Sequence, residues 1–396
     1  MLTADLTERV LARADELAAE LVEIRRDLHA NPELSWAEQR TSRRVLDRLK
    51  AAGLSPTPIG ETGVLVDIGA GAGPVVALRA DLDALPVPDL TDDPWRSTTE
   101  GVAHACGHDV HTAGVLGAGI ALAAVADQLP GRVRLIFQPA EEIMPGGALV
   151  AIQAGALDGV SSIFALHCDP GVEVGRLGLR EGPITGAADS LDVRLTGNGG
   201  HTSRPHLTED LTFALGKVIT ELPAVLSRRL DPRAGVSVVW GLVQAGSAMN
   251  VIPATGRAAG TVRMLDAVAW ADAESLVTEI IGQLVEPYGV KPEVTYVRGV
   301  PPVINEPAST ALLGHAIETV VGTDGLLTTT QSLGGEDFAW YLERVPGAMA
   351  RLGTRTPGGP RYDLHQGNLR VDDRAVVLAA KVLAVAALQS LEASIR

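Results

Sequence analysis

Residues 75–85 read Val-Val-Ala-Leu-Arg-Ala-Asp-Leu-Asp-Ala-Leu, an apolar run that ends on two carboxylates, Asp81 and Asp83. A short run of Val, Ala and Leu bounded by polar residues is typical of a strand buried on both faces of a sheet. Ligands of an open α/β sheet gather beyond the carboxyl ends of its strands. The two carboxylates therefore mark the end of this predicted strand as a candidate site.

Two later stretches repeat this pattern. The apolar run 132–138 is followed by Glu141 and Glu142, and the run 162–167 closes on His167. If these strands lie parallel to the first in one sheet, their polar ends meet at the same edge. The sequence thus predicts that carboxylates and an imidazole cluster at the carboxyl edge of the sheet.

Helices and strands alternate around these runs, which predicts an α/β fold whose mostly parallel sheet has helices on both faces. Apolar residues at helical spacing predict helices at 6–28, 36–52, 112–126 and 147–156. Short apolar runs predict strands at 64–68, 75–79, 132–138 and 162–167.

Residues 184–300 have a different character and predict an inserted domain. Alternating polar and apolar residues predict strands at 189–196, 235–243, 255–264 and 293–297, with helices at 207–226 and 267–286. Such strands form an antiparallel sheet with one covered face, here an α+β domain with two helices. The earlier alternation then resumes and ends in a helix at 372–391, so the first domain is predicted to comprise 1–183 and 301–396.

A thiol and several imidazoles stand together in residues 104–111, His-Ala-Cys-Gly-His-Asp-Val-His. In an extended segment Cys106 and His108, two positions apart, would point to the same side of the chain. Thiolate and imidazole are strong ligands for divalent metals, which favours a metal-dependent hydrolase over an inert buried thiol. The candidate ligands are Cys106, His108, Glu142, His167 and His365.

The composition narrows the class of partner. The chain has 396 residues, two cysteines and a formal net charge of −15 without a basic stripe. Nucleic acid and anionic membranes are therefore poor partners, and a small-molecule substrate is expected. The longest apolar stretch, 113–126, is shorter than the roughly 20 residues that span a bilayer, and the charged N-terminus lacks a secretory pattern. Because two cysteines cannot form a disulfide framework, we expect a cytoplasmic protein.

A series of motifs extends these observations over nearly the whole chain. They are Arg26-Asp27-Leu28-His29, 78–86, 104–111, 137–142, Gly199-Gly200-His201, Asn250-Val251-Ile252-Pro253, 260–263 and Gly335-Glu336-Asp337-Phe338. In this order they resemble the M20 metallopeptidase superfamily, specifically its amidohydrolase branch. That branch includes hippurate hydrolases and bacterial N-acyl-L-amino-acid amidohydrolases. The resemblance implies that 184–300 is a lid domain through which a homodimer forms.

The resemblance also implies roles for individual residues. The five candidate ligands would hold two divalent ions (Mn²⁺, Zn²⁺, Ni²⁺ or Co²⁺), and Glu141 would be the general base. His201 resembles the lid histidine that reaches the active site, in some relatives from the partner subunit. Asn250 and Arg263 resemble lid residues that hold the substrate carboxylate. Asp83, if it is not a turn or cap residue, would orient a ligand imidazole.

These residues predict hydrolysis of the amide bond of N-acyl-L-amino acids. A bound metal lowers the pKa of its water to about 7 and polarises the carbonyl, and a base returns the proton to the leaving amine. Arg263 could pair a free carboxylate in a two-point fork. Three alternatives stay open: a metallo-carboxypeptidase or dipeptidase on the same site, a thiol amidase with Cys106 as nucleophile and His108 as base, and a binding module without turnover.

Overall fold

The computed structural model describes residues 2–394 and divides into two compact units. Unit 1 contains the chain up to Gly182, Ile304–Thr330 and the chain from Asp337 onward. Unit 2 contains Pro183–Val303 and Gln331–Glu336. The main segment of unit 2 starts one residue before the predicted 184–300 and ends three residues after it. The sequence pattern did not indicate that Gln331–Glu336 joins unit 2.

Unit 1 is built on an eight-stranded sheet in the order β1-β2-β4-β3-β5-β16-β6-β15. The strands are β1 (Thr57–Ile59), β2 (Gly63–Ile68), β3 (Val75–Asp81), β4 (Arg132–Gln138), β5 (Val160–Glu173), β6 (Leu177–Leu179), β15 (Leu326–Thr328) and β16 (Gly347–Arg355). β3 is parallel to β4 and β5, and β5 is parallel to β16. The predicted α/β class with a mostly parallel main sheet is confirmed.

Helices cover this sheet. They are α1 (Leu2–Glu16), α2 (Ala18–Ala30), α3 (Gln39–Ala51), α4 (His108–Ala123), α5 (Ala148–Gln153), α8 (Pro307–Val321), α9 (Ala339–Leu342) and α10 (Arg374–Ala393). α4 and α10 approach closely because their contact is made of small residues. A Cβ added at Gly114 would lie 2.8 Å from Cβ of Ala379. α10 is long and apolar enough to cross a membrane, but 78% of its apolar window is buried as a core helix.

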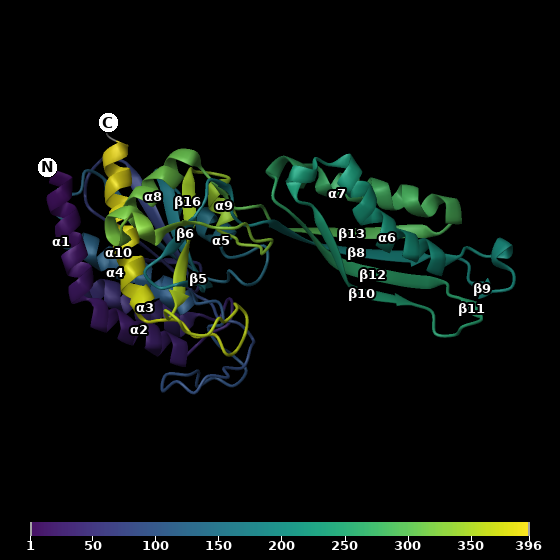
Figure 1. The fold of residues 1–396 in the computed structure, drawn as a ribbon, viewed down its shortest axis with the longest axis horizontal. Coiled ribbons are helices and arrows are strands. Elements are labelled where there is room, and N and C mark those ends of the chain that lie inside the picture. The colour runs from purple at the N-terminus through teal and green to yellow at the C-terminus, as the bar shows by residue number, and fades with distance from the viewer. Residues whose placement is uncertain (1, 395–396) are drawn as a thin grey trace. The chain divides into compact units, whose positions relative to one another are not determined.

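Unit 2 is a four-stranded antiparallel sheet in the order β10-β12-β8-β13, with two helices on one face (Figure 1). Its elements are β8 (Ala187–Thr196), β10 (Ser237–Ala245), β12 (Thr255–Met264), β13 (Lys291–Val300), α6 (Leu211–Arg229) and α7 (Ala267–Val285). A ribbon of β9 (Gly200–His201) and β11 (Val251–Ile252) lies beyond the end at which β12 begins (Figure 1). The short strands β7 (Gly182–Pro183) and β14 (Ile304–Asn305) lie where the chain passes between the units. The separate antiparallel domain is confirmed.

Several element boundaries differ from prediction. The predicted helix 6–28 is interrupted at Leu17 between α1 and α2. α3 begins at Gln39, not at residue 36, because Trp36 has φ 66°, which is incompatible with a right-handed helix. α4 begins at His108, four residues earlier than predicted. β5 does not close on His167, because its pairing with β16 continues to Glu173.

Candidate metal centre and active site

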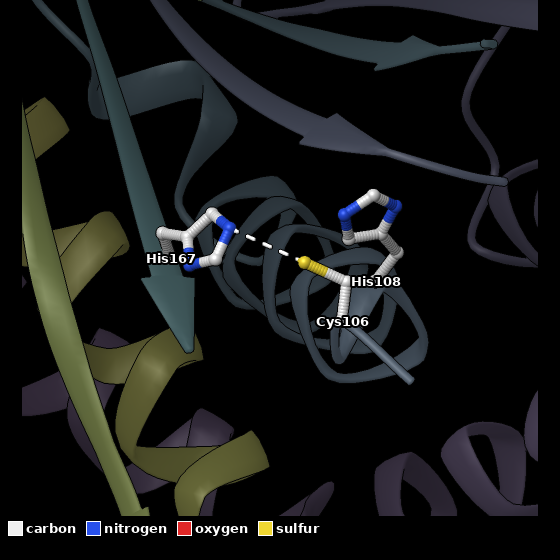
Figure 2. A group of neighbouring side chains, drawn as sticks. All are labelled: Cys106, His108 and His167. Carbon is white, nitrogen blue, oxygen red and sulfur yellow. Dashed lines mark hydrogen bonds between the residues drawn. The ribbon is translucent and has the colours of Figure 1, made fainter. Parts of the chain in front are cut away.

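The five candidate ligands all lie in unit 1, on four separate stretches of chain. Cys106 and His108 stand at the start of α4, and His167 lies within β5. Glu142 follows β4, and His365 lies in the loop before α10. Figure 2 shows the first three side chains converging, with Cys106 Sγ 3.5 Å from His167 Nε2. The donor atoms lie within 4.8 Å of one another in two groups, Cys106–His108–His167 and Cys106–Glu142–His365.

Gly107 is the residue that brings Cys106 and His108 together. Its φ of 88° and ψ of 19° place it in the left-handed region immediately before α4. A Cβ here would also lie 2.7 Å from Sγ of Cys168, so only glycine fits. The prediction that Cys106 and His108 lie on the same side of an extended segment is wrong about the backbone, because His108 is already in α4. They converge because a tight turn leads directly into a helix.

The hydrogen bonds of His108 and His167 leave the same ring nitrogen of each ready to bind a cation. His108 Nδ1 lies 2.9 Å from the carbonyl oxygen of Asp83, and His167 Nδ1 lies 2.8 Å from that of Cys168. A carbonyl only accepts, so Nδ1 of each neutral ring carries the proton and Nε2 presents a lone pair. His108 Nε2 is buried and has no hydrogen-bond partner among the described residues.

Glu142 and His365 complete the cluster. Glu142 Oε1 lies 3.8 Å from His108 Nε2 and 3.4 Å from His365 Nε2. Within residues 2–394, this buried oxygen also accepts no hydrogen bond. The backbone N–H of His365 donates to the carbonyl of Ala105 at 2.7 Å, which fixes the loop that carries this imidazole.

Asp83 links a candidate ligand to the two glutamates. Its carboxylate accepts the backbone N–H groups of Glu141 and Glu142 at 3.1 and 3.0 Å and the hydroxyl of Ser35 at 2.6 Å. Asp83 Oδ1 also lies 3.3 Å from Nδ1 of His108. Burial raises the pKa of Asp83, but the bonds from His108, Ser35 and Glu142 outweigh burial and lower it. Asp83 therefore remains a carboxylate that orients both the imidazole and the glutamate turn.

The Cys106 thiol is suited to binding a metal rather than to attacking a substrate. Burial raises its pKa, and the opposing effect of His108 does not compensate. A nucleophilic cysteine needs a lowered pKa, so these surroundings disfavour the thiol amidase alternative. A bound cation stabilises the thiolate directly, because a coordinating thiol loses its proton to the metal.

His111 lies beside the candidate ligand His167, with ring centroids 5.1 Å apart, and supports that part of the cluster. Its Nε2 accepts the backbone N–H of Cys168 at 2.8 Å, so the proton is on Nδ1, which donates to Asp81 Oδ1 at 2.6 Å. His111 therefore connects the end of β3 to Cys168, the residue that follows the candidate ligand His167. Its spacing of three from His108 was an available signal, because residues three apart on a helix are neighbours.

Backbone strain is concentrated around the same cluster. Within the described part of the chain, the non-glycine residues with positive φ are Trp36, Ala140 and His365, at 66°, 53° and 62°. Ala140 precedes Glu141, and Trp36 follows Ser35, a donor to Asp83. Residues held in sparsely populated backbone regions cost of order 1–3 kcal/mol each and cluster at active sites. Their distribution here supports the same location for the site.

The other three predicted site residues lie in unit 2. His201 lies in β9, which pairs with β11 directly after Asn250, so these two share the ribbon. Arg263 lies near the opposite end of β12, where its guanidinium donates to the carbonyl of Leu333 at 2.5 Å. Thr255, at the ribbon end of β12, is eight residues from Arg263. At about 3.3 Å per residue, roughly 26 Å of strand separates Arg263 from that end.

The cluster in unit 1 fits a divalent metal centre. A thiol, three imidazoles and a carboxylate form a donor set suited to Zn²⁺ and other first-row divalent ions. Among the described residues neither His108 Nε2 nor Glu142 Oε1, both buried, has a hydrogen-bond partner, which is costly unless a ligand satisfies them. Five donors shared between two ions leave positions for water and substrate, as in catalytic rather than structural sites.

Known proteins that are similar to this chain point to a family of hydrolases. A model of peptidase family M20/M25/M40 matches residues 77–389. The N-acetyl-L-cysteine deacetylase of Bacillus subtilis (strain 168) is 37% identical over 369 residues, covering 93% of this chain and 87% of that relative. Other matching relatives are named as an amidohydrolase and as carboxypeptidases.

One relative is much longer than this chain. The protein named "Putative glutamate--cysteine ligase 2-3" from Rhodococcus jostii (strain RHA1) is 52% identical over 382 residues. The match covers 96% of this chain, which spans only 48% of that relative's length. Among solved structures, the YXEP protein of Bacillus subtilis is described as a dinuclear metal binding peptidase from the M20 family. It superposes with a TM-score of 0.83 and 32% identity over 96% of this chain and 99% of that one.

Proposed function

Because the chain belongs to peptidase family M20/M25/M40, a family of hydrolases, we propose that it cleaves the amide bond of N-acyl-L-amino acids at a two-metal centre. The observation that carries the proposal is the convergence of Cys106, His108 and His167 beside two buried acceptor atoms that have no hydrogen-bond partner in the described part of the chain. When bound, the two cations would supply a water of lowered pKa and polarise the substrate carbonyl. The residues that would hold them are Cys106, His108, Glu142, His167 and His365.

Glu141 is the proposed general base. Its Oε2 lies 3.8 Å from His108 Nε2, so its carboxylate reaches the candidate ligands. Its backbone N–H is fixed by Asp83, which sets the direction from which the side chain approaches. From there Glu141 would take a proton from the attacking water and return it to the leaving amine.

We propose that residues of two copies complete each active site. Arg263 and, from the other copy, Asn250 would hold the substrate carboxylate, and His201, which shares the ribbon with Asn250, would stabilise the oxyanion. Arg263 lies about 26 Å of strand away from the end of β12 at which the ribbon with His201 lies. One lid domain therefore cannot bring Arg263 and His201 to the same small substrate. The edge strand β10 supports dimerisation, because it exposes Val239 and Val243, and an exposed apolar edge is a template for pairing.

The acyl group and the amino acid are the open part of the proposal. Two relatives from Bacillus subtilis are named as N-acetylcysteine deacetylases, which makes acetyl and cysteine the first pair to test. A second candidate is carboxypeptidase or dipeptidase activity on the same centre, favoured by relatives named as carboxypeptidases. N-acyl amino acids and the peptides cleaved by a carboxypeptidase or dipeptidase both have an amide bond beside a free carboxylate.

A substrate screen on metal-loaded protein distinguishes these functions. Protein loaded with Mn²⁺, Zn²⁺, Ni²⁺ or Co²⁺ would be incubated with N-acetyl, N-benzoyl and long-chain N-acyl amino acids and with dipeptides. We expect free amino acid from the N-acyl compounds and loss of release after chelation. Preferred cleavage of dipeptides would establish the second candidate. Chelator-resistant turnover with an acyl group attached to Cys106 would establish a thiol amidase instead.

We also infer that the protein acts in the cytoplasm on a small molecule, without nucleic acid or a membrane as partner. Both cysteines are free and buried, and a reduced thiol at Cys106 suits a reducing compartment. The net charge of −15 opposes binding to polyanions.

A further inference from the structure

The hydrogen bonds of His201 determine which of its ring nitrogens carries the proton. The backbone N–H of Ser203 donates to His201 Nδ1 at 3.1 Å, and the hydroxyl of Ser203 lies 2.9 Å from the same nitrogen. A backbone N–H can only donate, so Nδ1 is the acceptor. In the neutral imidazole the proton is therefore on Nε2.

The backbone that carries Ser203 is itself held in place. The N–H of Arg204 donates to the carbonyl of His201 at 2.9 Å, which closes a turn over 201–204. The N–H of Thr202 donates to the carbonyl of Asn250 at 3.3 Å, which joins this turn to the neighbouring segment. The Ser203 amide therefore has a fixed orientation relative to the imidazole.

We propose that Ser203 is a positioning residue whose backbone N–H holds His201 in the Nε2–H tautomer. The inference rests on the proposed function, in which amide hydrolysis places negative charge on the former carbonyl oxygen. Nε2–H would donate a hydrogen bond to that oxygen, which is the role of an oxyanion-hole donor. The opposite tautomer would present a lone pair to the oxyanion and repel it. His201 transfers no proton in this scheme, since Glu141 carries the proton from water to amine.

The tautomer can be measured without any turnover. Full-length protein loaded with Zn²⁺ and labelled with ¹⁵N-histidine would be recorded in long-range ¹H–¹⁵N spectra of the imidazoles. The His201 signals are assigned by their absence from His201→Gln. We expect a protonated Nε2 and an unprotonated Nδ1, and a protonated Nδ1 would overturn the proposal. Because no substrate is present, this result is independent of whether the proposed reaction is correct.

A variant of Ser203 distinguishes the contribution of its backbone N–H from that of its hydroxyl. Ser203→Ala removes the hydroxyl at 2.9 Å but retains the N–H at 3.1 Å. The Nε2–H signature of His201 should therefore persist in Ser203→Ala. Its loss would show that the hydroxyl, not the backbone amide, sets the tautomer, and would contradict the proposal.

A matched pair of substitutions tests the donor role. The side-chain amide of Gln places an N–H near the position of histidine Nε2, whereas that of Asn places it near Nδ1. Removing one oxyanion-hole donor costs roughly 10²–10³ in kcat. We expect kcat of His201→Gln to exceed that of His201→Asn by about tenfold or more, with similar KM values. Equal loss in both variants, when the spectra of the unmodified protein show a protonated Nε2, would reject the donor role of this nitrogen.

Discussion

Glu141 and Glu142 are adjacent, yet the proposed mechanism gives them different tasks because their surroundings differ. Glu142 Oε1 lies between the imidazoles of His108 and His365, whereas Glu141 Oε2 is 3.8 Å from His108. The sequence predicted that both carboxylates follow a strand, and the structure places them there. The family resemblance divided the roles in the sequence analysis, and position along the chain could not, because two neighbours at a strand end look alike until the backbone turn is known.

Glu141→Gln should lower kcat by about 10²–10⁴, because the amide cannot accept the proton of the attacking water. Its metal content should stay at the wild-type level, since the ligand set remains. Glu142→Gln is the matched control, with the same chemical change one residue later, and it should lower metal content. Metal analysis and steady-state kinetics of both variants provide the measurement. Wild-type kcat in Glu141→Gln would remove that residue from the mechanism.

His111→Ala should destabilise the fold and weaken metal binding together. The substitution removes the bonds of 2.6 Å to Asp81 and 2.8 Å to the N–H of Cys168. A buried group left without its partner costs about 1–3 kcal/mol, and loss of a support behind a ligand costs roughly 10–100-fold in metal affinity. Thermal unfolding and metal titration check both effects. Unchanged affinity would mean that His111 does not position His167.

At the scale of elements, the start of α4 is the feature that the sequence predicted least well. The apolar pattern of α4 begins at Val110, so it locates the buried body of the helix but not its first turn. The start at His108 depends on the left-handed Gly107, whose tight contact is with Cys168 of a distant strand. A non-local contact of this kind leaves no periodic signal. Strands β3 and β4 were easier to predict, since burial on both faces produces continuous apolar runs.

Gly107→Ala should destabilise the protein more than its backbone angle alone explains. Gly101 is the control, because its φ of 73° is similar but a Cβ there would meet nothing within 4 Å. Gly101→Ala should lower the free energy of unfolding by only about 1–2 kcal/mol, the cost of an L-residue in the left-handed region. Gly107→Ala should lower it by about 1–3 kcal/mol more, because the added methyl group overpacks against Cys168. Urea unfolding compares the two, and part of the difference should be recovered in Gly107→Ala/Cys168→Ala. Equal losses would contradict the packing explanation.

At the scale of the whole molecule, the sequence predicted an inserted domain, because its alternating strands contrast with the continuous runs around it. It did not place Gln331–Glu336 with that domain. The backbone carbonyl of Leu333 in this segment accepts a hydrogen bond from the guanidinium of Arg263. The two residues are 70 positions apart in the sequence. Chain position also could not reveal that Arg263 and His201 lie at opposite ends of unit 2. That separation follows only from strand register.

Mixing two inactive variants tests whether an active site draws on two copies. Glu141→Gln and His201→Ala would be mixed under conditions that exchange subunits. In a shared site, one of the two sites of each mixed dimer regains both groups, so about one quarter of wild-type activity should return. Activity after mixing, compared with each variant alone, is the measurement. No recovery in a verified mixed dimer would place both groups in the same copy.

The proposed hydrolysis depends on Cys106 and its neighbouring side chains binding the metals that make it possible. Titration of metal-free protein with Co²⁺, followed by sulfur-to-cobalt absorption and by hydrolysis of an N-acyl amino acid, tests this most directly. The absorption and the activity should rise together from a negligible starting level and saturate near two ions per subunit. Full turnover in the metal-free protein, or activity that rises without a sulfur band, would contradict this mechanism.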